Sequence, residues 1–449
     1  MCQSFHHVAV VLLCRLSLMF TVRTSLVLCL AGHRSYVITD QHDQHAVTSP
    51  SCPSLCTCSV DLVVRCQGQK VITVPQFPPN EHHRLFAELN MAGANVRKLL
   101  PDDFVGLRVR RIVLNGNRLG DALNETVFVG VGNHLRSLML GACAIRTLPP
   151  RLLAYLIQLE VLHLWSNHIE VIPEGFFVAN SELNELLLWG NNIETINNRT
   201  FYGLRRLRLL DLDRNRLSAV ERGALSHVRH TLEVLRLSEN HISSLSSSIL
   251  SNLRQLRVLT LASNRLRFID ARMFVGLDQL QTLSLANNRI QFLADGSFQH
   301  LVRLRTLNLS GNRLDRVWAG TFTGLSALTS VDLSRNRLSR LPEAVFGQSP
   351  ALRQLVVEDN WLSTLARCTL SSHARMRFIS VIGNMLECGC RLVWISQPDM
   401  SASTMLGNCV PDNPDDQSRQ HDPVIPVHKT ASYIDYRFCP LDASHSCLL

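Results

Sequence analysis

The sequence predicts an α/β solenoid whose concave face is lined by a parallel β-sheet and whose two ends are capped by disulfides. Three observations predict this class. An apolar pattern recurs about every 24 residues through most of the 449-residue chain, and repeats of this length stack into curved, elongated folds. Each copy contains one short alternating segment of strand length. Cysteines cluster directly before the first copy and directly after the last.

The repeated pattern reads LxxLxLxxNxL, and its asparagine sets the register of the copies. Aligning on that position defines about thirteen units over residues 81–385. The first unit is degenerate, and the third has cysteine in place of asparagine. The aligned positions are Ala94, Asn117, Cys143, Asn167, Asn191, Asn215, Asn240, Asn264, Asn288, Asn312, Asn336, Asn360 and Asn384.

Within each copy, leucines alternate with other residues. In "LRTLNLSGNRL", which begins at Leu304, Leu307 and Leu309 are expected to point into the core, because successive strand side chains face opposite sides. The residues between them then lie on the concave surface. A looser return segment follows and contributes a stacked column of phenylalanines, namely Phe104, Phe177, Phe201, Phe274, Phe298, Phe322 and Phe346.

The recurring asparagine is expected to bond to backbone groups of adjacent turns, because the chain leaves the sheet there and loses its strand partners. Cys143 can replace this amide only weakly, and Ala94 cannot replace it. We therefore interpret the unit of Ala94 as a terminal repeat shaped by its cap.

The beginning of the chain is typical of a secretory signal. Residues 8–31 are largely apolar, but Arg15 and Arg23 interrupt them, and each charge would cost roughly 2.5 to 3.5 kcal/mol at the centre of a bilayer. A signal peptide over residues 1–31, cleaved near "CLA", is therefore favoured over a membrane anchor. Residues 32–51 then form a linker. We expect no membrane span in the mature chain.

Eight cysteines form a group of four at each end of the repeats. An oxidising compartment makes disulfides their expected state. Zinc is the alternative for four clustered cysteines, and the secretory start of the chain disfavours it. The two groups are Cys52, Cys56, Cys58 and Cys66, and Cys388, Cys390, Cys409 and Cys439.

With "CPSLCTCSVDLVVRC" at 52–66 and "NMLECGCRLVWI" at 384–395, the chain resembles the extracellular leucine-rich-repeat family with cysteine-rich caps, which includes Slit, the Nogo receptor and chondroadherin. The resemblance implies a horseshoe with an N-terminal cap at 52–80, a C-terminal cap at 386–440 and a tail at 441–449. It is specific for the fold and not for the ligand. The disulfides it implies are Cys52–Cys58, Cys56–Cys66, Cys388–Cys409 and Cys390–Cys439.

Three further cysteines lie outside these pairs. Cys143 and Cys368 are interpreted as buried free thiols. Cys447 is a candidate for an intermolecular bond, and a free terminal thiol describes it equally well.

Two tryptophans occupy the same concave slot in successive repeats. Trp165 and Trp189 each lie two residues before the asparagine, where most other repeats have serine or alanine. A contiguous aromatic patch on a rigid surface is typical of a protein-binding site. The alternative is that the two indoles only cover each other and the sheet. The predicted patch comprises Met139, Val161, His163, Trp165, Leu187, Trp189, Asp211, Asp213 and Arg236.

A second surface is defined by the residue that follows the asparagine. The net charge is +9, and four consecutive repeats place arginine in this slot, which predicts a basic ridge suited to sulfated glycosaminoglycans. Acids interspersed near the ridge weaken this hypothesis. The ridge residues are Arg265, Arg289, Arg313 and Arg337.

Three N-x-S/T sequons predict glycosylation at Asn124, Asn198 and Asn308. The first two fall outside the concave strands, whereas Asn308 begins "NLS" within a strand. Glycosylation would therefore leave the tryptophan region open.

We expect a non-catalytic recognition protein. The sequence has neither HExxH nor GxSxG, and no recurring cysteine, histidine and acid constellation predicts an enzyme, a metal site or a cofactor. The favoured function is a secreted scaffold that binds a protein ligand or receptor in adhesion, matrix or signalling. The alternatives are a matrix protein that binds sulfated glycosaminoglycans and an innate immune recognition protein; nucleic acid is not an expected partner.

Overall fold

A computed structural model of the chain describes residues 51–68, 70–366, 369–370, 376–387, 404–410 and 425–426. The chain divides into two units, residues 1–48 and 49–449, and all described residues belong to the second. Several expectations lie outside the described residues. These are the signal peptide at 1–31, the linker except Ser51, Cys368, Cys388, Cys390, Cys439, Cys447 and the tail at 441–449.

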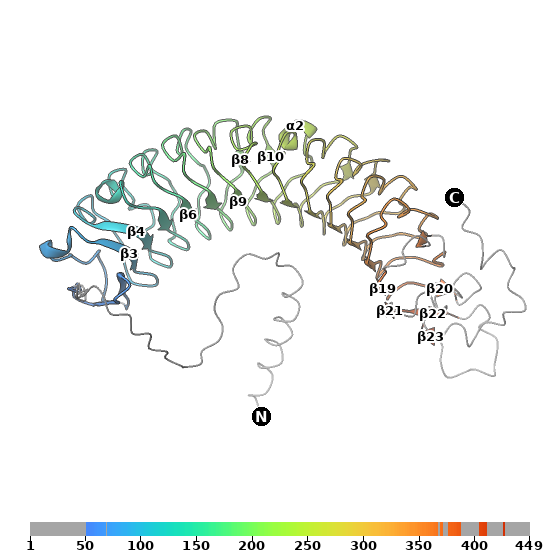
Figure 1. Cartoon of the computed structure of the whole chain (residues 1–449), viewed down its shortest axis with the longest axis horizontal. Coiled ribbons are helices and arrows are strands. Elements are labelled where there is room, and N and C mark those ends of the chain that lie inside the picture. Colours follow the sequence, from blue (N-terminus) through green and yellow to red (C-terminus); the bar gives the residue numbers. More distant parts are fainter. Residues whose placement is uncertain are drawn as a thin grey trace, which may run out of the picture. The chain divides into compact units, whose positions relative to one another are not determined.

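The repeats build one curved sheet whose strands line the inner side of an arc, while the return segments lie on the outer side (Figure 1). The sheet has sixteen strands, and those of the repeats pair in parallel in chain order. Without the two N-terminal strands and the last strand, thirteen remain, which confirms the predicted number of units. They are β3 (Leu85–Asn90), β4 (Arg108–Val113), β5 (Ser137–Met139), β6 (Val161–His163), β7 (Glu185–Leu187), β9 (Leu209–Asp211), β11 (Val234–Arg236), β12 (Val258–Thr260), β14 (Thr282–Ser284), β16 (Thr306–Asn308), β17 (Ser330–Asp332), β18 (Gln354–Val356) and β19 (Phe378–Ser380).

The return segments consist mainly of turns. The helical elements that the structure describes in full are α2 (Ser247–Leu250) and the 3₁₀ turns η2 (Pro79–Glu81) and η3 (Val129–Val131), so the α part of the predicted class is small. Two short parallel pairs also form beyond the concave sheet. They are β8 (Thr195–Ile196) with β10 (Ala219–Val220), and β13 (Phe268–Ile269) with β15 (Phe292–Leu293).

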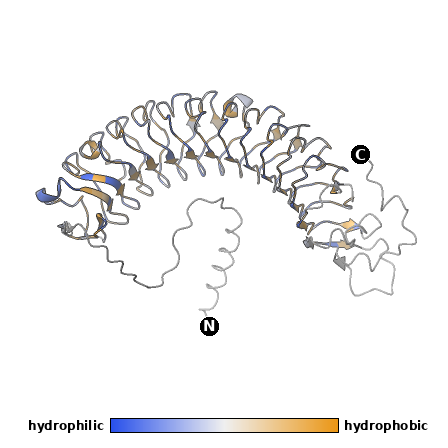
Figure 2. Ribbon diagram, viewed as in Figure 1, coloured by the Kyte–Doolittle hydropathy of each residue, from blue (hydrophilic) through white to orange (hydrophobic). Residues whose placement is uncertain are grey.

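The core follows the predicted alternation. The central residue of each three-residue repeat strand is buried, and its neighbours face the concave surface; in Figure 2 the longer strands β3 and β4 carry both hydrophilic and hydrophobic residues. The predicted phenylalanine column is fully buried. Phe298 and Phe322, for example, stack with ring centroids 6.3 Å apart and planes 7° apart.

The asparagine ladder bridges neighbouring turns as expected. The Asn167 amide donates to the carbonyl oxygens of Leu140 and Leu164 at 2.8 and 2.9 Å, and its Oδ1 accepts from the Ile145 nitrogen at 3.0 Å. Cys143 replaces part of this arrangement, since its Sγ donates to the Leu114 oxygen at 3.1 Å. It is a buried free cysteine, as the sequence predicted.

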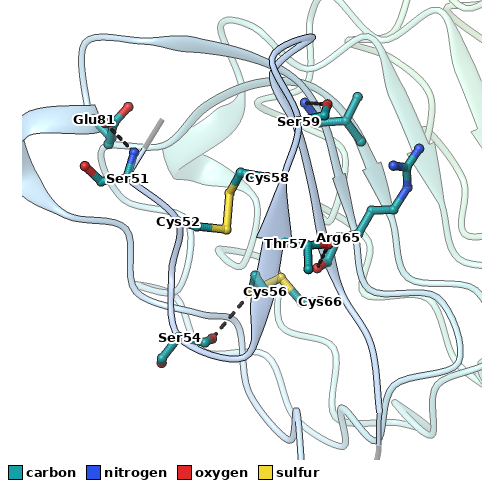
Figure 3. The surroundings of a disulfide bond; sticks show 11 residues. Ser51, Cys52, Ser54, Cys56, Thr57, Cys58, Ser59, Arg65, Cys66 and Glu81 are labelled. Atoms are coloured by element: carbon teal, nitrogen blue, oxygen red, sulfur yellow. Dashed lines mark hydrogen bonds between the residues drawn. A yellow bond between two sulfur atoms is a disulfide. The ribbon is translucent and has the colours of Figure 1, made fainter. Parts of the chain in front are cut away.

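The N-terminal cap covers the first repeat strand with a hairpin. Strands β1 (Cys56–Cys58) and β2 (Val63–Cys66) pair antiparallel, and β2 pairs in parallel with β3. The structure contains the implied disulfides Cys52–Cys58 and Cys56–Cys66 (Figure 3). The cap therefore closes the sheet edge that would otherwise expose unpaired backbone groups.

At the other end, β21 (Thr404–Leu406) extends the concave sheet beyond β19. Strands β20 (Leu386–Glu387), β22 (Asn408–Val410) and β23 (Ile425–Pro426) form a separate small sheet. Cys409 is disulfide-bonded, and its implied partner Cys388 lies outside the described residues.

Candidate functional site: the concave indole patch

The predicted patch lies on strands β5 to β11 and the turns that follow them. Register aligns the last residue of each strand in one row across the sheet. Met139, His163 and Leu187 in this row are half-buried and border the indoles. Val161 opens β6 and is also half-buried. Asp211 and Arg236 follow in the same row and end the patch, while the row itself continues to Thr260 on β12.

Trp165 and Trp189 form a parallel stack, with ring centroids 5.1 Å apart and planes 2° apart. The stack begins at Gly141, the residue that occupies the same slot one repeat earlier. A Cβ at Gly141 would lie 2.3 Å from Cε2 of Trp165, so the indole covers the glycine. Both indoles are half-buried. The two rings cover each other and the sheet, as the alternative interpretation expected, but they still face solvent in part.

A histidine–carboxylate pair lies beside the stack. Nε2 of His163 lies 3.0 Å from Oε1 of Glu185, and the side chains are 15% and 35% exposed. The hydrogen bond with His163 lowers the pKa of Glu185. The pair fixes the His163 ring on the patch, where the exposed part of Glu185 adds negative charge.

Two carboxylates and one arginine border the C-terminal side of the stack. Asp211 pairs with Nη1 of Arg236 at 3.3 Å, and its side chain is 6% exposed, whereas Arg236 is 48% exposed. Asp211, which the sequence analysis placed in the patch, is therefore a buried support of it and not a freely presented group. Oδ1 of Asp213 accepts from the Ser238 nitrogen at 2.5 Å. Burial, followed by the charge of Asp211, raises the pKa of Asp213 to about 6.

The predicted arginine ridge lies on a different surface. Arg265, Arg289, Arg313 and Arg337 are all exposed, and no ion pair involves them among the described residues. Each backbone nitrogen donates to the preceding turn, as from Arg313 to the Ile290 oxygen at 2.8 Å, so the four side chains leave successive turns in register.

The asparagines of two sequons are exposed. Asn124 and Asn198 lie in return segments, whereas Asn308 is half-buried at the end of β16. Asn308 Oδ1 accepts from the nitrogen and hydroxyl of Ser310 at 2.9 and 2.7 Å.

Sequence reasoning missed three contributors. Gly141 makes room for Trp165, and its place in the tryptophan slot was the available signal. Glu185 bonds to His163, and it is the residue on β7 that pairs with Val161 on β6. Trp361 follows Asn360 as each ridge arginine follows its asparagine, and it extends the ridge with an indole that is 62% exposed.

The described residues contain no group of three or more histidine, cysteine or acidic side chains arranged to hold a metal ion. In the same part of the chain, no helix is long and apolar enough to cross a membrane.

Comparison with known proteins agrees with the solenoid. Four overlapping matches to the leucine-rich-repeat family model cover residues 157–217, 205–266, 254–314 and 311–362. These matches identify leucine-rich repeats over residues 157–362, and the thirteen stacked turns and the asparagine ladder give the chain the solenoid fold of such repeats.

Two curated proteins are similar to part of the chain. Podocan of Mus musculus is 32% identical over 151 residues, which is 33% of this chain and 23% of Podocan. Reticulon-4 receptor-like 2 of Homo sapiens is 34% identical over 124 residues, or 26% of this chain and 27% of the relative. The chain thus spans about a quarter of the length of either relative.

Solved structures share the fold. A leucine-rich-repeat protein of Leptospira interrogans superposes with a TM-score of 0.64 at 25% identity, covering 73% of this chain and 79% of that one. A chain in the octameric complex of Latrophilin 3, Unc5D and FLRT2 superposes with a TM-score of 0.55 at 20% identity, covering 87% and 100%. The second likeness concerns the fold alone.

Proposed function

We propose that the chain is an extracellular, non-catalytic scaffold that binds a protein ligand or receptor through the concave indole patch. One observation carries the proposal. Two parallel indoles stand in a slot that small residues fill in most other repeats, and their half-exposed rings form an apolar surface on a rigid sheet. Aromatic residues at such positions commonly supply most of the energy of a protein interface.

The scaffold itself favours recognition. Leucines in every turn and a bonded asparagine ladder hold the patch in place before binding, so little conformational entropy is lost when a partner docks. The N-terminal disulfides favour an oxidising compartment. The name of one similar protein is in keeping with this role, since that relative is named as receptor-like.

The test is a binding screen of the secreted chain against a panel of extracellular protein domains, repeated with the variant Trp165→Ala, Trp189→Ala. We expect a hit whose Kd rises by at least about 30-fold in the variant, since interface tryptophans contribute roughly 2 kcal/mol or more. The matched control is Trp318→Ala, Trp361→Ala, which removes two exposed indoles that lie off the concave patch. If both variants bind the hit with wild-type affinity, the concave patch is excluded as the binding site.

A second candidate function is supported by the arginine ridge. The ridge arginines are exposed and in register, and Trp361 continues their row, so a linear sulfated glycan could follow the charges and stack a sugar ring on the indole. We expect binding to immobilised heparin that weakens steeply with salt, because exposed charges are screened. Replacing Arg265, Arg289, Arg313 and Arg337 by glutamine should lower the salt concentration of elution.

The matched control for the ridge removes the same charge elsewhere. Arg110, Arg146, Arg151 and Arg254 are exposed and scattered, and their replacement by glutamine should shift elution less. Equal shifts for the two quadruple variants would reduce the ridge to a share of the overall positive charge.

A further inference from the structure

We infer that the concave patch receives a cationic side chain, an arginine or lysine of the protein partner, against the outer face of Trp189 with Asp213 as its counter-ion. This inference rests on the proposed function and specifies the chemistry of the partner. It is carried by the direction in which neighbouring side chains lean, by the local charge and by the lack of a cation over either indole among the described residues.

The side chains in the turns before and after the unstacked face of Trp189 lean in opposite directions. Trp165 leans onto Gly141, and Trp189 stacks on Trp165 at 5.1 Å, so the stack lies toward the N-terminal end of the sheet. Asp213 occupies the same slot in the next turn but bonds to the Ser238 nitrogen of the turn beyond. The ring face of Trp189 that does not stack on Trp165 is thus on the side of the next turn, where Asp213 occupies the equivalent slot.

The local charge is negative although the chain is basic. Glu185, Asp211 and Asp213 face the fixed positive charge of Arg236, which pairs with Asp211 at 3.3 Å. Among the described residues, Asp213 has no ion-pair partner of its own. Its pKa, raised to about 6 by burial and by Asp211, indicates that its negative charge is poorly compensated.

In the part of the chain that the structure describes, no cation lies over Trp165 or Trp189. Within the described residues, the single cation–π contact joins Arg316 to Trp318 at 5.8 Å, on another surface. An indole face beside a carboxylate is suited to a guanidinium or ammonium group, because the ring quadrupole and the carboxylate attract the same charge.

The test uses small probes that differ by one charge. The full-length secreted protein is labelled with 5-fluorotryptophan, its resonances are assigned by Trp→Phe variants, and it is titrated at pH 7.4 with N-acetyl-arginine amide. N-acetyl-citrulline amide, which has the same shape without the charge, is the matched probe. We expect the arginine probe to shift the Trp189 resonance in a saturable way and the citrulline probe to leave it unchanged, with Trp318 and Trp361 as internal controls.

Two carboxylate variants complete the design. Asp213→Asn keeps an oxygen for the Ser238 nitrogen but removes the charge, and it should weaken the arginine probe by about 3-fold to 30-fold. Asp359→Asn removes an exposed carboxylate near the other end of the sheet and should leave the Trp189 response unaltered. Equal responses to both probes, or full binding by Asp213→Asn, would overturn the inference.

The two proposals fail separately. A protein ligand that is lost in Trp165→Ala, Trp189→Ala but binds normally to Asp213→Asn would keep the concave patch as the binding surface and refute the cation site. Suppose that the arginine probe shifts the Trp189 resonance in a saturable way, but a protein ligand binds Trp165→Ala, Trp189→Ala with wild-type affinity. This combination would refute the proposed function instead. Self-association of the wild-type chain that Asp213→Asn abolishes would assign the cation to a second copy and contradict the assignment to a different protein.

Discussion

The indole of Trp165 occupies the space that a side chain at Gly141 would need. Its Cε2, Cδ2 and Cζ2 atoms lie 2.3 to 2.6 Å from the position of a Cβ there. Gly141 is in this way the base of the stack that continues through Trp165 to Trp189. The patch therefore depends on one glycine whose role is to be small, since its backbone is not in the left-handed region.

The first prediction concerns Gly141→Ala. The added methyl should displace the indole of Trp165 and break its parallel contact with Trp189. We expect a weaker near-ultraviolet circular dichroism signal from the indole pair and a loss of about 1 kcal/mol in the free energy of unfolding. This is the low end of the cost of overpacking, because the half-exposed ring can move outward.

A double-mutant cycle is the control for this substitution. In a Trp165→Ala background the methyl has no ring to meet, so Gly141→Ala should there cost close to nothing. An equal cost in both backgrounds would show that the alanine strains the backbone and does not act on the indole.

The second prediction concerns the missing ladder amide at Cys143. An asparagine there would donate to the Leu114 and Leu140 oxygens and accept from the Leu119 nitrogen, as Asn167 does one turn later with the equivalent groups. The thiol makes weaker bonds, to the oxygens of Leu114 and Gly141. We expect Cys143→Asn to raise the free energy of unfolding by about 0.5 to 1.5 kcal/mol, measured by urea denaturation.

Cys143→Ser separates the ladder from a general effect of removing sulfur. Serine is too short to bridge two turns, so it should not stabilise the chain. If both variants gained the same stability, the amide ladder would not be the cause.

The third prediction concerns pH. The folded-state pKa of Asp213 is raised from 3.8 to about 6, so below about pH 4 both folded and unfolded forms are protonated and the full stabilisation is present. Between pH 4 and 6 the unfolded chain releases this proton first, and stability is lost as the pH rises. Asp211 contributes in the same direction. Glu185, whose pKa is lowered, instead loses stabilising free energy as the pH falls.

Asp213→Asn should remove the part of the pH dependence of the free energy of unfolding that comes from Asp213. The stability gained by the variant over wild type should grow from near zero at pH 4 to about 1 kcal/mol at pH 7, because partial exposure reduces the full effect of the shift. Urea denaturation at four pH values measures this difference. A gain that is constant across pH would contradict an ionisation effect.

The fold could be predicted from the sequence because every turn repeats the same requirements. Leucine spacing fixes which side chains enter the core, and the asparagine fixes the register, so the two tryptophans could be placed in one concave slot. The alternation does not reveal in which direction a side chain leans. The contact of Trp165 with Gly141 and the burial of Asp211 depend on the rotamers of these side chains, and the sequence pattern does not predict rotamers.

The turn geometry also escaped prediction. The residue before the ladder position has a positive φ in all thirteen repeats, as at Gly190 (71°) but also at Ser166 (53°) and Arg214 (55°). Glycine fills five of these thirteen positions, but the other eight carry side chains, so composition alone did not reveal that the left-handed conformation is common to every turn. The interturn bonds, such as that from the Ser166 nitrogen to the Trp189 oxygen at 2.8 Å, select it despite its intrinsic cost.

The last prediction concerns the sequon at Asn308. In strand order, β16 lies five strands beyond β7, which is roughly 24 Å at the usual strand spacing. A glycan at Asn308 would cover the C-terminal part of the concave sheet and leave the indole patch open. We expect Asn308→Gln to lose one glycan by intact mass, and to change the affinity for a ligand of the patch by less than about 2-fold.

Moving the glycan tests the distance directly. Thr260→Asn with Ala262→Ser, in the Asn308→Gln background, creates the sequon in the same register on β12, three strands beyond β7 and so roughly 15 Å away. A glycan there should cover Arg236 on the adjacent strand and weaken the ligand by 10-fold or more, about 1.4 kcal/mol. Unchanged affinity with confirmed occupancy would show that the ligand does not approach the concave face from that side, and the binding surface would have to lie elsewhere on the arc.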